Sequence, residues 1–367
     1  MNLHQGKDLL WAQSASKMNV QLITTILAAA LAVFTAVGTA TAESPSDFYK
    51  NREIKLVIGS APGGGYDTYS RLLTKHMVRF IPGESARILP INMPGAAGMR
   101  AANWIDNIGP KDGSSILILR RGLPLYQVMG GKTLTANLAR MNWICDLSDS
   151  PPVLVTWHAS SIRTIEDAKK QETTVGGSGG DSMTAQLSTA YNRLLGTQFK
   201  AITGYQGGGE VNLAMERGEL AGRATNNLAS WKTVKPDWIA ENKLNFILLL
   251  ALKHDPDIPT TPLLTELVKG DAEKEAVARF LTLGNTLGRP LAVGSEVPQE
   301  RVEMLRAACE KTLADPEFRA DAERQGAEFN FRSGKDVQAI LAELASTPEA
   351  IIALAKRYMD YKEDDPN

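Results

Sequence analysis

The chain has 367 residues, with 40 Lys plus Arg against 41 Asp plus Glu and a formal net charge of −1 at pH 7. This balance argues against a polybasic surface, so we expect neither a nucleic-acid partner nor an electrostatic contact with lipid. Two cysteines, Cys145 and Cys309, are too far apart in sequence to indicate a disulfide framework. We interpret both as buried thiols, with a bridge as the alternative in an oxidising compartment. No Cys/His cluster has the spacing of metal ligands, so we expect no metal site and no cofactor.

Residues 1–42 have the pattern of a secretory signal peptide. Two lysines precede an uncharged, mostly apolar stretch at 20–38, and Ala40, Thr41 and Ala42 form an A-x-A cleavage pattern. The apolar stretch is also about long enough to be an N-terminal membrane anchor. The small-residue pattern favours export with cleavage near Ala42. The remaining 43–367 are enough for two domains of ordinary size.

The first part of the remaining chain alternates between strands and helices. Apolar runs predict strands at 54–60, 86–93 and 114–120, and helical spacing predicts helices at 67–80 and 94–108. This alternation predicts an α/β chain with a parallel, doubly wound sheet.

The same order returns further along the chain. An extended run at 151–159 and a short helix at 164–171 precede two strand–loop–helix segments at 173–196 and 199–220. A strand from 245, a strand within 287–295, and helices at 298–315, 316–326 and 333–347 complete the chain. A second α/β sheet is therefore expected after the extended run.

Four of the predicted helices begin in glycine-rich loops, at 62–68, 94–98, 176–182 and 206–210. Backbone N–H groups at a helix start have no partner inside the helix, and glycine lets an anion approach them. Each loop could also be only a tight connection. Ligands of open α/β sheets bind at the carboxyl ends of strands, so two facing sheets would bring these loops to one cleft.

The segments "IKLVIGSAPGGGYDTYSRLL", "INMPGAAGMRAANWI" and "PKDGSSILIL", in this order and spacing, resemble the substrate-binding receptors of tripartite tricarboxylate transporters, the Bug-type periplasmic receptors. "TTVGGSGGDSMTAQLSTAYNRLLG" and "ITGYQGGGEVNLAMERGEL" are similar to later segments of that family. The resemblance covers most of 50–345. It implies a type II periplasmic-binding-protein fold of two domains, 43–150 plus 252–367 and 151–251. Each domain would be a doubly wound, mostly parallel sheet with flanking helices, with two crossover strands at the hinge.

The resemblance also implies a function. A periplasmic receptor without enzymatic activity would capture a small organic anion, a mono- or dicarboxylate, in the cleft between the domains. Domain closure about hinges near 147–153 and 250–258 would bury the ligand, and integral-membrane transporter subunits would receive it. We expect the receptor to be a monomer.

In this family the ligand carboxylate is held largely by main-chain groups of the glycine loops. The matching positions are Gly63, Gly64, Gly65, Tyr66, Asp67 and Thr68, with Asn92, Pro94, Gly95 and Gly98 nearby, and Ser178, Gly179, Gly180, Asp181 and Ser182 in the second domain. Asp67 at a helix start is expected to cap backbone N–H groups rather than touch the ligand. Tyr66 at the loop tip is a candidate to cover the ligand, and Tyr205 is a second one that also fits the core or rim.

The chain departs from the family pattern in ways that add positive charge. The usual Phe-Asp-Asn segment is Ala224, Thr225 and Asn226 here, so its acidic residue is missing. Arg120 and Arg121 end a predicted strand, where a guanidinium can bind a carboxylate through two hydrogen bonds. Since neighbouring strand residues point to opposite sides, we expect one of the two to face the cleft. A surface ion pair is the alternative.

These departures make the predicted cleft more cationic, which suits a di-acid better than an amino acid. Arg223 could add to the charge, whereas Arg289 is interpreted as structural.

A secreted serine hydrolase is the alternative function. "GGSGG", 176–180, matches the G-x-S-x-G pattern of a nucleophile turn, with Ser178 as nucleophile and His254 as the later histidine that could serve as base. Glycine turns produce this pattern by chance, and the other three glycine loops would have no role in such an enzyme.

Overall fold

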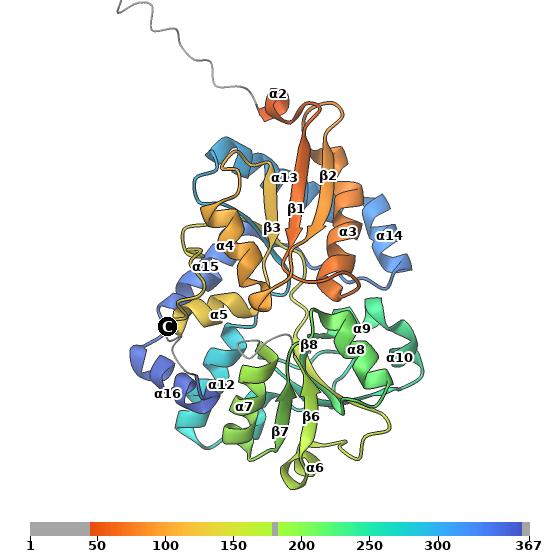
Figure 1. Ribbon diagram of the computed structural model, residues 1–367, viewed down its shortest axis with the longest axis vertical. Helices are drawn as coiled ribbons and strands as arrows, with labels where there is room; N and C mark the ends of the chain where they lie inside the picture. Colours follow the sequence, from red (N-terminus) through yellow and green to blue (C-terminus); the bar gives the residue numbers. More distant parts are fainter. Residues whose placement is uncertain (1–44, 178–182, 362–367) are drawn as a thin grey trace, which may run out of the picture. The chain divides into compact units, whose positions relative to one another are not determined.

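The structure is a computed structural model that describes residues 45–177 and 183–361. These residues form two β-sheets with helices on both faces (Figure 1). The expected signal peptide and the predicted positions Ser178 to Ser182 lie outside the described residues. The α/β fold class expected from the sequence is confirmed.

The first sheet has six strands in the spatial order β11-β4-β10-β3-β1-β2. Their bounds in chain order are β1 (Glu53–Ile58), β2 (Arg87–Asn92), β3 (Ser115–Ile118), β4 (Asn142–Asp146), β10 (Pro290–Val293) and β11 (Arg332–Ser333). β1 runs parallel to β2 and β3, whereas β10 is antiparallel to β3 and β4, and β11 is antiparallel to β4.

The second sheet has five strands in the order β7-β6-β8-β5-β9. These strands are β5 (Pro152–Trp157), β6 (Thr173–Gly176), β7 (Phe199–Ile202), β8 (Gly222–Asn227) and β9 (Leu244–Leu249). β6 is parallel to β7 and β8, and β5 is antiparallel to both β8 and β9. Both sheets are mixed, but most strands of each run in one direction, as expected: β1, β2, β3 and β4 in the first sheet, and β6, β7, β8 and β9 in the second. The opposed strands β5 and β10 each follow a crossing of the chain between the sheets, whereas β11 is added later at an edge of the first sheet.

Helices cover both faces of the first sheet, because its central strands alternate between two cores. Ile54, Leu56 and Ile58 of β1 face one core while Val57 faces the other. The first face carries α2 (Pro45–Tyr49), α3 (Gly65–Met77), η1 (Val78–Phe80), α13 (Gln299–Ala314) and α14 (Pro316–Arg324); the second carries η2 (Ala96–Gly98), α4 (Met99–Asn107), α5 (Gly122–Val128) and α15 (Gly334–Ala345).

The second sheet is covered in the same way. One face carries α6 (Ile165–Lys170), α7 (Met183–Leu195), α11 (Leu264–Leu267), α12 (Ala272–Leu283) and α16 (Glu349–Met359); the other carries α8 (Gly208–Glu216), α9 (Leu228–Val234) and α10 (Pro236–Ala240). α16 packs against α7, so the C-terminal part of the chain does not stay with the first sheet. The domains 43–150 plus 252–367 and 151–251 remain a proposal, as do the hinges, which fall on the β4–β5 connection and on the chain after β9.

Within 45–177 and 183–361, no single helix is long and apolar enough to cross a membrane, and α15 and α16 reach that length only as a pair bent by 85°.

Cys145 of β4 and Cys309 of α13 form a disulfide, so the interpretation of both as buried thiols is wrong. Both side chains are fully buried in the same core, and their Cα atoms are 6.7 Å apart, within the range that a disulfide can span. The sequence separation of 164 hides this proximity, which the packing of α13 on β4 creates.

Reduction of this disulfide is expected to lower the free energy of unfolding by about 2–5 kcal/mol, because the bridge restricts the unfolded chain. Urea denaturation with and without a reductant measures the change. The double variant C145A/C309A is the control and must be insensitive to the reductant. Equal midpoints for the reduced and oxidised wild-type protein would contradict the prediction.

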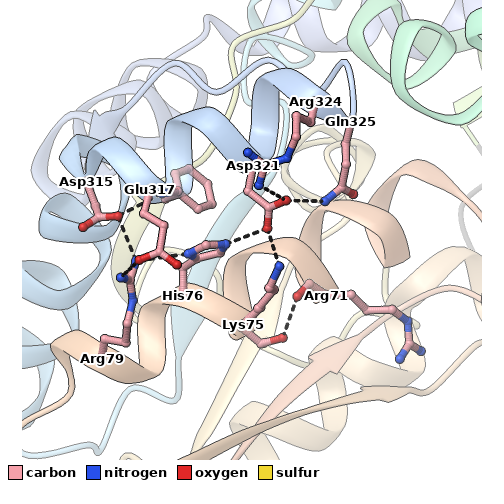
Figure 2. Close-up of polar contacts among 11 residues, drawn as sticks. Arg71, Lys75, His76, Arg79, Asp315, Glu317, Asp321, Arg324 and Gln325 are labelled. Atoms are coloured by element: carbon pink, nitrogen blue, oxygen red, sulfur yellow. Dashed lines mark hydrogen bonds and ion pairs between the residues drawn. The ribbon is translucent and has the colours of Figure 1, made fainter.

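A polar network joins α3, whose first residues reach the site described below, to α14 (Figure 2). The buried carboxylate of Asp321 accepts hydrogen bonds from Lys75 Nζ at 2.7 Å and Arg324 Nη2 at 3.0 Å, and His76 Nε2 lies 2.8 Å from it. The hydrogen bond from Lys75 and that to His76 hold the pKa of Asp321 well below its usual range. Arg79 adds contacts to Asp315 and Glu317 at the start of α14.

Asp321→Asn is expected to lower the free energy of unfolding at pH 7 by about 2 kcal/mol, because the buried His76 ring and two cationic side chains lose a charged acceptor. A carboxylate with a lowered folded-state pKa stabilises the fold above its ordinary pKa and loses this effect as the pH falls further. The difference from wild type should therefore be constant near neutrality and shrink below about pH 4 in urea titrations. Glu323→Gln, on the exposed side of α14, is the control.

Candidate functional site

A cavity of about 70 Å³ lies where the carboxyl ends of strands from both sheets meet. One water needs about 10–15 Å³ by this kind of measure, so the cavity is much larger than a packing defect. It is lined by Ser60, Gly64, Gly65, Tyr66, Ala97, Met99, Arg120, Arg121, Gly122, Leu123, Tyr126, Gly176, Gly177, Thr184, Gly207, Gly208, Val211, Arg223, Thr225, Asn226 and Ser230. All four predicted glycine loops contribute residues to this list.

Two of these loops touch through their backbones. A Cβ atom at Gly64 would lie 3.5 Å from the amide nitrogen of Gly208, and one at Gly209 would lie 3.5 Å from the carbonyl oxygen of Gly63. Gly64 precedes α3 and Gly207 precedes α8, so two helix starts are brought face to face. Glycine permits this close approach because neither loop carries side chains between the backbones.

Three guanidinium groups line the cavity. Arg120 and Arg121 follow β3, and Arg223 lies on β8 of the other sheet. Arg120 lies over the Tyr66 ring, with Cζ 5.9 Å from the ring centre, and Arg223 is 5.7 Å from the centre of the Trp231 ring. Among the described residues none of the three is paired with a carboxylate, and the cavity lining contains no acidic side chain.

The burial of these groups is electrostatically unfavourable. Burial, together with a smaller effect of neighbouring arginines, lowers the pKa of Arg121 to about 10 and that of Arg223 to about 9. Burial also lowers the pKa of Arg120. Because a guanidinium keeps its proton in proteins at neutral pH, the cavity holds three positive charges that an anion would neutralise.

The cavity also contains polar side-chain atoms without a hydrogen-bond partner. Nη1 of Arg121, Oγ of Ser60 and Oγ1 of Thr225 are all buried and unpaired. Leaving such groups unpaired costs free energy, so a ligand with acceptor atoms would compensate them. Ser230 Oγ accepts a hydrogen bond of 2.6 Å from Arg289 Nη2, which leaves its own hydroxyl proton to be donated elsewhere. The side chains around the cavity are therefore mainly donors.

Comparisons with known proteins agree with this architecture. No protein-family model matches the chain. The "UPF0065 protein in gbd 5'region" of Cupriavidus necator is 24% identical over 320 residues, which are 85% of this chain and 90% of the relative. The solved structure of the periplasmic binding protein BugD has a TM-score of 0.67 and 18% identity, covering 86% of this chain and 100% of BugD. MatC from Rhodopseudomonas palustris, solved with bound malate, has a TM-score of 0.65 and 19% identity, covering 82% of this chain and 99% of MatC.

The chain has the fold of the Bug-type periplasmic binding proteins. The fold that the glycine-loop segments implied by their resemblance to this family is therefore confirmed. BugD is a periplasmic binding protein, and the malate bound to MatC is a dicarboxylate.

Several predicted site residues stabilise the first glycine loop without lining the cavity. The buried carboxylate of Asp67 accepts hydrogen bonds from the Gly63 amide at 3.0 Å and from Asn92 Nδ2 at 3.0 Å, and it pairs with Arg71. Thr68 Oγ1 donates to the carbonyl of Gly64. None of Gly63, Asp67, Thr68, Asn92, Pro94 and Gly95 lines the cavity. The geometry of Asp67 agrees with a capping role.

Tyr66 and Tyr205 lie in different places, and only Tyr66 lines the cavity. The Tyr66 hydroxyl donates to the Gly288 carbonyl at 3.2 Å and accepts from the Arg121 amide at 3.1 Å, so its ring is a fixed part of the wall. Tyr205 does not line the cavity and packs on the core beside α8.

Arg120 and Arg121 both line the cavity, so the expectation that only one faces it is wrong. β3 ends at Ile118, and Arg121 has the helical backbone angles φ −55° and ψ −30°. The side chains of Arg120 and Arg121 therefore do not alternate as they would in a strand. Asn226 also lines the cavity. Ser60, Thr184 and Ser230 line it too, although the sequence did not single them out. Of these, Ser60 directly follows β1, a position at the carboxyl end of a strand that could have identified it.

The hydrolase alternative gains no support from the described residues. No histidine lines the cavity, and His254 is partly exposed with Nε2 2.9 Å from Glu266 Oε1. Ser178 lies outside the described residues. Within the described ranges, no group of three or more His, Cys, Asp or Glu side chains could hold a metal ion.

Arg223→Met is expected to raise the free energy of unfolding of the ligand-free protein by about 1–2 kcal/mol, because a half-buried charge without a carboxylate partner among the described residues is removed while the aliphatic length is kept. Because the pKa of Arg223 is lowered to about 9 in the folded state, its charge destabilises the fold fully at any pH below about 9. This destabilisation declines as the pH rises above about 9, so a measurement at pH 7 shows all of it.

Urea denaturation at pH 7 measures this change. The exposed Arg217→Met is the matched control and should stay within about 0.5 kcal/mol of wild type. A loss of stability in Arg223→Met would contradict an electrostatically unfavourable site.

Proposed function

We propose that this protein is a periplasmic solute receptor that captures a small organic anion, a carboxylate with two or more charges, between its two sheets. The observation that carries the proposal is one cavity lined by three guanidiniums, with no acid among its described lining residues. The Bug-type fold supports a solute-binding role, and the malate in MatC is an anion of the proposed class.

The cavity would bind such an anion from two sides. Arg120, Arg121 and the start of α3 belong to the first sheet, and Arg223 with the start of α8 belongs to the second. Guanidiniums bind carboxylates through paired hydrogen bonds, and free amides at helix starts favour negative charge. A ligand held from both sides would draw the sheets together and exclude water, which strengthens each polar contact.

We further propose that the closed receptor delivers the ligand to integral-membrane transporter subunits, that it acts as a monomer without enzymatic activity, and that it reaches the periplasm after cleavage near Ala42. The uptake of a labelled ligand by cells with and without the receptor tests delivery. Analytical ultracentrifugation tests the oligomeric state, and N-terminal sequencing of the exported chain tests cleavage.

Binding is tested by a thermal-shift and calorimetric screen of mono-, di- and tricarboxylates against the chain without residues 1–42. A ligand at one hundred times its Kd should raise the free energy of unfolding by about 2.7 kcal/mol. Arg120→Met and Arg121→Met are each expected to weaken the best ligand about tenfold or more, whereas Arg217→Met should leave its affinity unchanged.

The absence of binding by any carboxylate would overturn the proposal. Turnover of a chromogenic ester that is lost in Ser178→Ala would support the hydrolase instead.

A further inference from the structure

Three glycines of the cavity loops lie directly against polar side chains. A Cβ atom at Gly98 would be 2.6 Å from Cδ of Arg120, and one at Gly208 would be 3.0 Å from Nη1 and 3.1 Å from Nη2 of Arg223. A Cβ atom at Gly65 would overlap the hydroxyl oxygen of Ser230. Each of these side chains lines the cavity. The glycines therefore occupy the places where a larger residue would collide with a donor group.

We propose that Gly65, Gly98 and Gly208 are positioning residues, which leave the space that Ser230, Arg120 and Arg223 need to point into the cavity. On this proposal the loops act in two ways: their amides face the ligand, and their missing side chains fix where the charged donors lie. The consequence for ligand selectivity rests on the proposed function, whereas the placement of the side chains can be tested without any ligand.

Neighbouring glycines in the same loops have a different environment. A Cβ atom at Gly64 or Gly209 would meet only backbone atoms of the opposite loop, at 3.5 Å or more, which is ordinary van der Waals contact. An alanine at either position therefore fits without displacing a neighbour. Gly208 and Gly209 therefore differ, although they are adjacent: a Cβ atom would press on Arg223 only at Gly208.

Gly208 gives the clearest case, because its partner is the tip of Arg223. The guanidinium also lies near the Trp231 ring and is 3.5 Å from Asn212 Oδ1, so protein atoms surround it on several sides. A methyl group at 208 would displace it by a few tenths of an ångström at little cost to folding. Paired hydrogen bonds to a carboxylate depend on the orientation of the guanidinium, so even this displacement weakens binding of an anion.

The test compares Gly208→Ala with Gly209→Ala. Both residues are among the first of α8 and neither has a positive φ, so alanine suits the backbone and does not weaken the helix. Arg223 lies on β8, and α8 packs on the sheet that contains β8. Their contact can therefore be examined in crystals of the ligand-free variants. We expect a displaced Arg223 side chain in Gly208→Ala and an unchanged one in Gly209→Ala. An unmoved Arg223 in Gly208→Ala, or an equal displacement in both variants, would overturn the proposal.

Calorimetry with malate and 2-hydroxybutyrate, which differ by one carboxylate, tests the consequence for selectivity. Gly208→Ala should weaken malate binding about three- to tenfold, affect 2-hydroxybutyrate less, and have no further effect in an Arg223→Met background. Gly209→Ala should change neither ligand. An equal loss for both ligands, or the same loss in the Arg223→Met background, would show that Gly208 acts through something other than Arg223. If wild type binds neither malate nor any other di-acid, the proposed function fails, while the crystal structures still decide the positioning role.

Discussion

The close approach of two glycine loops from different sheets is the constraint on which the site depends. Gly64 before α3 meets Gly208 at the start of α8 with no side chain between the backbones. This contact brings the carboxyl ends of β1 and β3 opposite those of β6 and β8, and the cavity is the space left between them. A side chain larger than a methyl group at Gly64 or Gly209 would collide with the opposite backbone and push the loops apart.

The charge within this space follows from the same arrangement. Three arginines that belong to two sheets are placed around one small volume, where Arg120 and Arg121 both lower the pKa of Arg223. Such an arrangement is unfavourable for the empty protein, and it becomes favourable only when negative charge enters. On the proposed function, the site lowers the stability of the ligand-free fold while it provides affinity for an anion.

The outer layers hold the loops in position. Hydrogen bonds of Asp67 to Gly63 and Asn92 stabilise the first glycine loop. The Tyr66 hydroxyl connects the same loop to the residues after β3 and before β10. Further out, Asp321 ties α14 to α3, and the disulfide fixes α13 to β4. Rigid support of this kind lets the loops keep their backbone geometry without side chains of their own.

The sequence by itself determined the local features: the alternation of strands and helices, the glycine-rich helix starts and the two arginines after β3. These depend on neighbours along the chain, through hydrophobic periodicity and backbone freedom. The tertiary structure decided the rest. Antiparallel insertion of β10 between β3 and β4, the pairing of Cys145 with Cys309, and the joint exposure of Arg120, Arg121 and Arg223 to one cavity all join distant segments. No local pattern encodes these contacts, because they arise from which faces pack together once the two sheets have formed.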